Sequence, residues 1–291
     1  MKIVLLNGEL TDPGRASISV YDRGFLYGDS VFETVRTYGG APYALDEHMQ
    51  RLGRSAERVH IRLPVAAEVI ADEVKKAISL ASNPESYVRV MVTRGTGPMG
   101  LDPDLAENPS RIVFVEPLVA PPRESYQRGI DAILVRTARA ADATAAAGAK
   151  VANYLSSLLA IRDAKRAGAS EALFVDGKGR VLEGASSNVF TVTRGRLVTA
   201  PEESGILAGI TRAHLIRAAT RLGIEVVPRA FTEADLFAAD EAFISSSIRE
   251  MLPVVRVNGR AIGPGVPGPL TRRIHEEFRA GAGAPGPLPW Q

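Results

Sequence analysis

The hydrophobic and polar positions of the chain follow a helical period in some segments and a strand period in others. Over about residues 46–60 the helical period predicts an amphipathic helix, carried by Leu45, Met49, Leu52, Ala56 and Val59. A second helix is predicted over residues 65–81.

The segment YVRVMVT follows the strand period. Its three valines point to one side of the strand, whereas Tyr87, Arg89 and Met91 share the other side. One face of this strand is therefore predicted to be core, and the other presents a phenol and a guanidinium. RIVFVEPL is predicted to be the next strand.

The second half of the chain repeats this mixture, so the pattern as a whole indicates a mixed α/β protein. We predict a strand at IDAILVR, a helix at NYLSSLLAIRDAKRAG, a hairpin at EALFVDGKGRVLEG and a helix at GITRAHLIRAATRLG. Further hairpin turns are indicated at TRGR and VNGR. The paired prolines of VAPPRESYQRG suit a linker between domains, and the tail GAGAPGPLPWQ is predicted to be disordered.

Composition excludes several classes of function. The balance of 35 Lys and Arg against 33 Asp and Glu leaves a net charge of +2, with no basic stripe for nucleic acid. No apolar run is long enough for a membrane span, and MKIVLLNGEL becomes polar too early for a signal peptide. The absence of cysteine excludes thiol catalysis and thiolate metal sites, and four scattered histidines do not indicate a metal site. We therefore expect a cytoplasmic protein with no nucleic acid, membrane or metal partner.

Lys150 is the first candidate for chemistry. It is the single cation of GAKVANYLSSL, and the run ARAADATAAAGAK supplies little polar cover and no obvious partner. Most lysines lie on a surface with the ammonium in water, which is the ordinary explanation for Lys150 taken alone. A lysine removed from water would instead lose proton affinity and become a nucleophilic amine, the form that makes Schiff bases with carbonyl compounds.

Four further segments carry candidate residues, each with an ordinary structural alternative. In HMQRL, His48 and Arg51 share a helix face, and Arg51 could hold a planar anion with two donors or could be solvated. In GILAGITR, Ile210 and Thr211 begin a helix whose free amides and dipole favour a phosphate, although such residues also simply start helices. The three successive hydroxyls of ISSSIRE could reach a phosphate or carboxylate, or could be loop material. In VLEGASSNVF, Glu183 precedes a small-residue turn, where a surface carboxylate is also usual.

Together these segments resemble a known family, the fold type IV pyridoxal-phosphate enzymes, which include branched-chain aminotransferases, D-amino-acid transaminases and aminodeoxychorismate lyases. The resemblance runs from NGEL near the start of the chain to GPLT near its end. It depends on the order and spacing of YDRGFLYGDSVFETVR, EHMQRL, YVRVMVTRG, KVANYLSSLLA, EALFVDGKGRVLEGASSNVF, GILAGITR and EAFISSSIREMLPV.

The resemblance implies pyridoxal 5'-phosphate as the cofactor and assigns its ligands position by position. Lys150 corresponds to the lysine that forms the Schiff base with the cofactor and moves the proton at Cα. Glu183 corresponds to the carboxylate beside the pyridine nitrogen, where an anion keeps the ring protonated. Tyr154 lies one residue nearer to Lys150 than the tyrosine that meets the ring hydroxyl in typical branched-chain enzymes. The phosphate cup is assigned to Arg51, Ile210, Thr211 and Ser247.

The substrate side separates the subfamilies of this family. Tyr27, Tyr87 and Arg89 match residues that shape the carboxylate end of the pocket in branched-chain enzymes. D-Amino-acid transaminases commonly place an arginine and a histidine after TRG, and lyases often have a second arginine there, whereas this chain has RGTGPMGLDP. Thr34, by contrast, resembles a threonine of the lyases.

The expected reaction is a ping-pong Schiff-base transfer of the amino group from leucine, isoleucine or valine to 2-oxoglutarate. Six residues are expected to contact the substrates: Tyr27 and Phe32 at the apolar side chain, Tyr87 and Ile248 at the carboxylate, and Arg36 and Arg89 at the distal carboxylate of glutamate. D-Amino-acid transamination and aminodeoxychorismate lyase chemistry are alternatives on the same scaffold. A nonenzymatic protein that binds a phosphate ligand is the more distant alternative.

The resemblance also implies the architecture of the molecule. We expect a small N-terminal α/β domain over residues 1–118, a linker over 119–128, a larger cofactor-binding domain with a barrel-like sheet over 129–280, and the tail over 281–291. The family implies a homodimer or higher homo-oligomer, with amino acids and 2-oxo acids as its small-molecule partners.

Overall fold

The computed structural model describes residues 1–136 and 146–291. The run ARAADATAAAGAK, which suggested little polar cover for Lys150, lies mostly outside these residues. Contacts divide the described residues into two compact units, which are residues 1–119 with 146–154 and residues 120–136 with 155–291.

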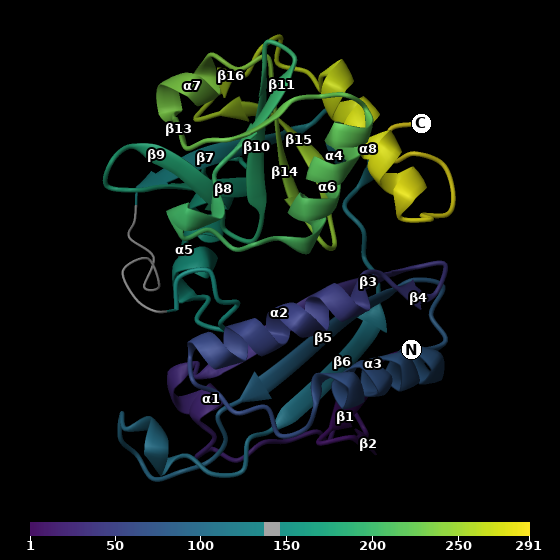
Figure 1. The fold of residues 1–291 in the computed structure, drawn as a ribbon, viewed down its shortest axis with the longest axis vertical. Coiled ribbons are helices and arrows are strands. Elements are labelled where there is room, and N and C mark those ends of the chain that lie inside the picture. The colour runs from purple at the N-terminus through teal and green to yellow at the C-terminus, as the bar shows by residue number, and fades with distance from the viewer. Residues whose placement is uncertain (137–145) are drawn as a thin grey trace. The chain divides into compact units, whose positions relative to one another are not determined.

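Six strands of the described residues form the antiparallel sheet of the first unit, in the order β2-β1-β6-β5-β3-β4 (Figure 1). Their bounds are β1 (Ile3–Leu6), β2 (Glu9–Thr11), β3 (Ser30–Tyr38), β4 (Ala41–Pro42), β5 (Ser86–Thr93) and β6 (Arg111–Pro117). The two strands predicted in this half are β5 and β6. The valines of β5 are completely buried, as the alternation predicted.

Two long helices, α2 (Leu45–Arg58) and α3 (Ala67–Ala81), cover one face of this sheet (Figure 1). The apolar positions of α2 pack with the strand valines in one core, which is why the helical period identified the helix. Both predicted helices are confirmed to within two residues at each end. Helix α2 ends before Val59 because His60 takes a φ of 55°, which a helix does not accept. The short helix α1 (Arg23–Tyr27) and the 3-10 turn η1 (Pro103–Leu105) also belong to this unit.

The other face of β3 and β5 carries the polar residues that the sequence singled out. The register of these strands sets Thr34 opposite Arg89. It sets Arg36 opposite Tyr87 in the same way, and Phe32 shares the side of Thr34 because it precedes it by two residues. The prediction that Tyr87 and Arg89 lie on one face is therefore confirmed.

Ten strands of the described residues form the sheet of the second unit, along the path β12-β11-β10-β14-β15-β7-β8-β9-β13, with β16 beside β15. Strand β9 pairs with β10 as well as with β8, so the sheet curls back on itself and is barrel-like, as expected. The bounds are β7 (Ile130–Arg136), β8 (Glu171–Val175), β9 (Arg180–Gly184), β10 (Asn188–Thr193), β11 (Arg196–Thr199), β12 (Val226–Pro228), β13 (Phe231–Thr232), β14 (Glu241–Ser246), β15 (Glu250–Val257) and β16 (Arg260–Ala261). The three predicted hairpins are present as β8–β9, β10–β11 and β15–β16.

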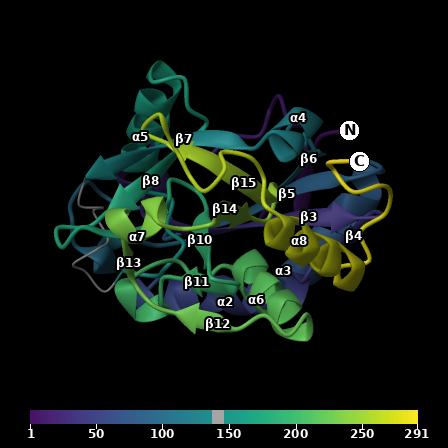
Figure 2. The ribbon, with the colours of Figure 1, turned by 90° about the horizontal axis from the view of Figure 1, so that it is seen from above.

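The longer helices of this unit pack on different strands. Helix α5 (Leu155–Arg166) lies against β7 and β8, whereas α6 (Ile210–Arg221) and α8 (Pro269–Gly281) lie side by side next to β14 (Figure 2). The shorter helices are α4 (Arg123–Gln127), η2 (Glu202–Ser204) and α7 (Glu233–Phe237). Among the residues that the structure describes, no helix combines the length and the apolar character that a membrane crossing requires.

The segments predicted to be the linker and the disordered tail make contacts within the second unit. Part of the predicted linker forms α4. In the predicted tail, the Trp290 ring lies 4.8 Å from the ring of His275, and Gln127 donates to the carbonyl of Trp290 at 3.4 Å.

Candidate functional site

Lys150 lies at the edge of β3, with its main chain held on two sides. The amide of Phe32 donates to the Lys150 carbonyl at 3.0 Å, and the amide of Ala152 donates to the Ser30 carbonyl at 3.0 Å. The Lys150 amide donates to the Ser55 hydroxyl of α2 at 3.1 Å. The segment therefore extends the sheet by a short antiparallel bridge, which fixes the point from which the lysine side chain starts.

The Lys150 side chain lies in surroundings that weaken its hold on a proton. Its Nζ is 4.4 Å from the centre of the Phe32 ring. Burial lowers the pKa of Lys150 to about 8, and the cations of Arg51 and Arg89 act in the same direction, against the anion of Glu33. The amine is therefore available in its neutral, nucleophilic form near neutral pH.

Arg51 is buried, so the solvated alternative for this residue is wrong. The planar anion that it holds with two donors is the carboxylate of Glu33 on β3, at 2.7 Å from Nε and 2.6 Å from Nη2. His48 places its Nδ1 2.7 Å from the same carboxylate. Burial would raise the pKa of Glu33, but Arg51 and His48 outweigh it and lower the pKa to about 2. Sequence reasoning missed Glu33, because an acidic residue within a strand carries no motif of its own.

The remaining aromatic and basic candidates of the first unit gather around Phe32. The Arg89 guanidinium lies 4.1 Å from the centre of the Phe32 ring, and its Nε is buried without a hydrogen-bond partner among the described residues. The Tyr154 ring meets Phe32 edge-on at 5.4 Å, and burial raises the pKa of the Tyr154 phenol against the nearby Arg89 cation, with the Tyr87 phenol also close. The structure thus brings Phe32, Tyr87, Arg89, Lys150 and Tyr154 together.

Tyr27 and Arg36 have other contacts. The Tyr27 hydroxyl accepts from the Gly100 amide at 3.1 Å, and Arg23 lies over the Tyr27 ring at 5.0 Å. The Arg36 guanidinium lies over the Tyr38 ring at 4.2 Å. No hydrogen bond or ring contact among the described residues joins Tyr27 to the group around Phe32.

In the second unit, Glu183 is the penultimate residue of β9 and a buried acceptor. Its Oε2 accepts from the Leu207 amide at 3.0 Å and from the Asn188 amide group at 3.4 Å. Asn188 also donates to the Leu207 carbonyl at 2.9 Å, so it connects the carboxylate to the loop before α6. The surface alternative for Glu183 is wrong, and Asn188 is a neighbour that sequence reasoning missed.

Helix α6 starts next to Asn188 because the residue before it is glycine. A Cβ on Gly209 would lie 2.0 Å from the Asn188 side-chain oxygen, a distance that no side chain tolerates. Ile210 and Thr211 form the first turn and are both buried. Backbone amides of a first helical turn lack intrahelical partners and carry the positive end of the helix dipole, which favours an anion.

Ser247 and Ile248 lie in the turn between β14 and β15. The next residue, Arg249, donates to Glu171 at 2.6 Å and to the Ser186 hydroxyl at 2.9 Å. The bond to Ser186 ties the turn to the loop after Glu183, and the bond to Glu171 ties it to the start of β8. Sequence reasoning missed Arg249 because its partners are distant in the chain.

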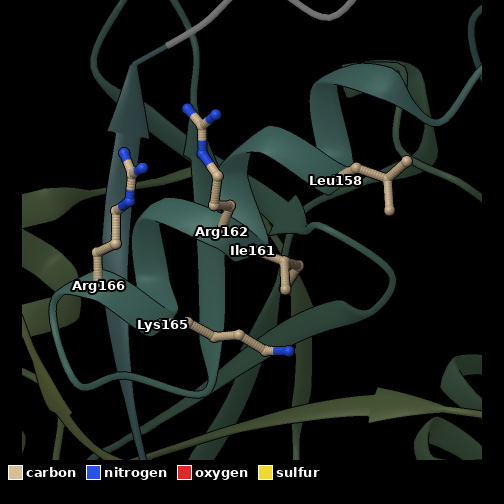
Figure 3. Close-up of a pocket in the computed structure, with 5 residues that line it drawn as sticks. All are labelled: Leu158, Ile161, Arg162, Lys165 and Arg166. Atoms are coloured by element: carbon tan, nitrogen blue, oxygen red, sulfur yellow. The ribbon is translucent and has the colours of Figure 1, made fainter.

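A shallow groove on α5 involves none of the predicted site residues. Figure 3 shows Arg162 and Arg166 extending in one direction from the helix and Lys165 in another, with Leu158 and Ile161 supplying apolar surface.

Each unit carries groups that fit one part of pyridoxal phosphate. The low-pKa amine of Lys150 suits an aldehyde, and the buried Glu183 carboxylate, held by the Leu207 amide, suits a protonated ring nitrogen. The start of α6, with the Thr211 hydroxyl, suits a phosphate. These chemistries fit the class of pyridoxal-phosphate enzymes.

The family follows from comparison with known proteins. The model of amino-transferase class IV matches residues 30–257, which is most of the chain, so the protein belongs to the class IV aminotransferases. Enzymes of this family depend on pyridoxal phosphate, and the protein is therefore a pyridoxal-phosphate-dependent aminotransferase.

Similar proteins of known name have two specificities. The branched-chain-amino-acid aminotransferase of Escherichia coli (strain K12) is 35% identical over 281 residues, covering 94% of this chain and 91% of that protein. The D-alanine aminotransferase of Bacillus licheniformis is 32% identical over 271 residues, covering 93% of this chain and 94% of that protein.

The fold is similar to solved branched-chain enzymes. The T.th. branched-chain amino acid aminotransferase complexed with N-(5'-phosphopyridoxyl)-L-glutamate has a TM-score of 0.90 and 31% identity, covering 97% of this chain and 95% of that one. Its complex with 4-methylvaleric acid has a TM-score of 0.88 and 30% identity with the same coverage.

Proposed function

We propose that the protein transfers the amino group of leucine, isoleucine or valine to 2-oxoglutarate. The observation that carries the proposal is the surface beside Lys150, where the Arg89 guanidinium lies over the Phe32 ring. The ring offers apolar contact to a hydrocarbon side chain, and the buried Nε of Arg89 lacks a partner within the described residues, so it is available to a second carboxylate. The similar T.th. enzyme binds N-(5'-phosphopyridoxyl)-L-glutamate and 4-methylvaleric acid, which supports the same pair of substrates.

Lys150 is the residue that we assign to proton transfer. Pyridoxal phosphate, when bound, supplies an electron sink for the charge left at Cα when its proton departs. Lys150 accepts this proton at Nζ and returns it, which its pKa of about 8 permits near neutral pH. The hydrogen bonds of its main chain to Phe32 and Ser55 hold the backbone still, so that only the side chain has to move.

The ligands of the cofactor are assigned residue by residue. Glu183 would accept a hydrogen bond from the protonated ring nitrogen, and the Leu207 amide keeps this carboxylate oriented. Tyr154 would meet the ring hydroxyl. The residues assigned to the phosphate are Arg51, Ile210, Thr211 and Ser247.

The substrate contacts follow from the same assignment. We assign the α-carboxylate to Tyr87 and the backbone of Ile248, and the apolar side chain to Phe32 and Tyr27. The distal carboxylate of glutamate is assigned to Arg89 and to Arg36, which lies on the same face of the sheet. The donor and the acceptor use the same surface, so they bind one after the other. The amino group is therefore transferred in two half-reactions.

We further propose that the protein is a cytoplasmic homodimer, which the family and the composition favour. Light scattering tests the assembly directly. A solution mass equal to that of one chain would rule out the homodimer.

D-Amino-acid transamination is the second candidate, because the B. licheniformis D-alanine aminotransferase is 32% identical to this chain. The loop RGTGPMGLDP lacks the arginine and histidine that such enzymes commonly place there, which is why the L-specific reaction is preferred.

The deciding experiment is a half-reaction. The protein reconstituted with pyridoxal phosphate is mixed with L-leucine or with D-alanine, without an acceptor, and the loss of its yellow absorbance is followed. Bleaching by L-leucine alone supports the proposal, and bleaching by D-alanine alone replaces it with the second candidate. Absence of bleaching by either would favour aminodeoxychorismate lyase chemistry, tested with that chorismate derivative.

A further inference from the structure

Glu33 is a carboxylate that the proposed roles leave unused. It is completely buried between β3 and α2. Its two oxygens accept from Nε and Nη2 of Arg51 at 2.7 and 2.6 Å, and His48 lies 2.7 Å from one of them.

The stability of the fold does not by itself explain a buried carboxylate such as that of Glu33. Removing an ion pair from water costs about as much as the pair returns, so well-packed apolar residues of similar volume serve a core equally well. The geometry of the pair has a more specific consequence. Two parallel hydrogen bonds from Arg51 to one carboxylate fix the plane of the guanidinium, which a single bond would leave free to rotate.

The pair also faces Lys150. The charges near the Lys150 amine are Arg51 on α2, Glu33 on β3 and Arg89 on β5. Arg51 and Arg89 lower the pKa of Lys150, and Glu33 raises it. His48 and the Tyr154 phenol are the neighbouring titratable groups of the same cluster. Glu33 therefore acts on Lys150 in the opposite sense to the cation that it holds.

We propose that Glu33 is a positioning residue that holds the Arg51 guanidinium in one orientation for the cofactor phosphate and offsets the repulsion between Arg51 and Lys150. This inference rests on the proposed assignment of Arg51 to the phosphate. It gives Glu33 no direct contact with the cofactor, so its influence passes through Arg51.

The test compares pyridoxal phosphate with pyridoxal, which lacks the phosphate. Dissociation constants of both are measured for the wild-type protein and for Glu33→Gln, with inorganic phosphate as a competing probe. The matched control is Glu73→Gln, because Glu73 accepts from Nε and Nη2 of Arg111 at 3.0 and 2.8 Å in the same unit. We expect the dissociation constant of pyridoxal phosphate to rise about tenfold in Glu33→Gln, the usual effect of one lost charged hydrogen bond, and that of pyridoxal to change less than about twofold.

Two further variants keep the test decisive if Glu33→Gln folds poorly. Glu33→Asp retains the anion and should lie between the wild type and Glu33→Gln. The double variant Glu33→Gln with Arg51→Gln removes both charges of the pair, so the buried Arg51 cation is not left without its anion. It should bind pyridoxal phosphate as weakly as Arg51→Gln alone, because Glu33 has nothing left to position.

A second readout is the pH dependence of the reaction between the Lys150 amine and pyridoxal in the cofactor-free protein. The midpoint should fall in Glu33→Gln, because the group that raises the pKa of Lys150 has been removed. Equal weakening of pyridoxal phosphate and pyridoxal, or an unchanged midpoint, would overturn the proposal. None of these measurements depends on which amino acid the enzyme uses, so a failed half-reaction with L-leucine leaves the result interpretable.

Discussion

Burial changes the chemistry of individual charged residues in this protein. Lys150 loses proton affinity because its amine is removed from water and faces two cations, whereas Glu33 keeps its charge because Arg51 and His48 surround it. Burial thus prepares Lys150 as a nucleophile, whereas the charged partners of Glu33 overcome its burial and keep it an anion.

At the residue scale, replacing Lys150 with alanine should abolish the half-reaction. We expect the rate of bleaching by the amino donor to fall by about 10²–10⁴-fold or more, the usual contribution of a positioned acid–base group. The matched control is Lys75→Ala, because Lys75 is exposed and pairs with the exposed Asp72 on the same helix. Wild-type rates in Lys150→Ala, measured by stopped-flow absorbance, would show that another group moves the proton.

At the scale of elements, strands set which side chains share a face, and helix starts set where backbone amides point. The register of β3 and β5 brings Arg89 beside Thr34 on the face that also carries Phe32. The absence of a side chain at Gly209 lets α6 begin beside Asn188. Each element therefore fixes the position of a side chain or a backbone amide, and the sequence of that element alone predicts this position only in part.

Replacing Arg89 with leucine should change specificity more than activity. The variant loses the guanidinium over Phe32 but keeps an apolar surface. We expect kcat/KM to fall at least about tenfold for glutamate and less than about threefold for leucine, since a charged hydrogen bond is worth about 1.5–3 kcal/mol. Comparing the two substrates in one variant provides the control, and equal losses for both would mean that Arg89 does not select the dicarboxylate.

Replacing Gly209 with alanine should disturb the start of α6. The added methyl group would meet the Asn188 oxygen, so Asn188 has to move and its contact with Glu183 is lost. Overpacking of this kind costs about 1–3 kcal/mol, and cofactor affinity should fall with it. In Gly177→Ala, the control, the new methyl meets nothing within 4 Å. Urea unfolding and cofactor titration of both variants check the expectation, which an unchanged Gly209→Ala protein would contradict.

At the scale of the whole molecule, buried anions make stability depend on pH. The pKa of Glu33 is lowered from 4.5 to about 2. Between these two pH values the Glu33 carboxyl is protonated in the unfolded protein and ionised in the folded protein. This contribution is complete above about pH 4.5 and is lost as the pH falls towards 2, with a size of about 3 kcal/mol. Asp176 and Asp235, whose pKa values are also lowered, act in the same direction.

Urea unfolding of the cofactor-free protein between pH 7 and pH 3 measures this effect. Glu33→Gln should be less stable at pH 7, and its stability should fall less than that of the wild type as the pH is lowered. The carboxylates of Asp176 and Asp235 are present in both proteins and cancel in the comparison. An acid dependence as steep in Glu33→Gln as in the wild type would assign the effect to other groups.

Much of the fold could be predicted because its elements have regular periods. The helical period of α2, the alternation of β5 and the three hairpin turns each depend on neighbouring residues, and all are present. The predicted boundaries of the domains stay predictions. Contacts group Lys150 with the first unit, although the chain belongs to the second unit again from Leu155 onwards.

The sequence by itself determined the elements that have regular periods or clear turns, the mixed α/β class and the resemblance to the family, because periodicity and motif spacing are local properties of a chain. Only the tertiary structure decided that Glu33 is the anion held by Arg51, since the two lie 18 residues apart and meet only when α2 packs on β3. It likewise decided that Arg249 ties the turn of Ser247 to Glu171, 78 residues away. Partners of buried charges follow from packing between elements, and no local pattern records that packing.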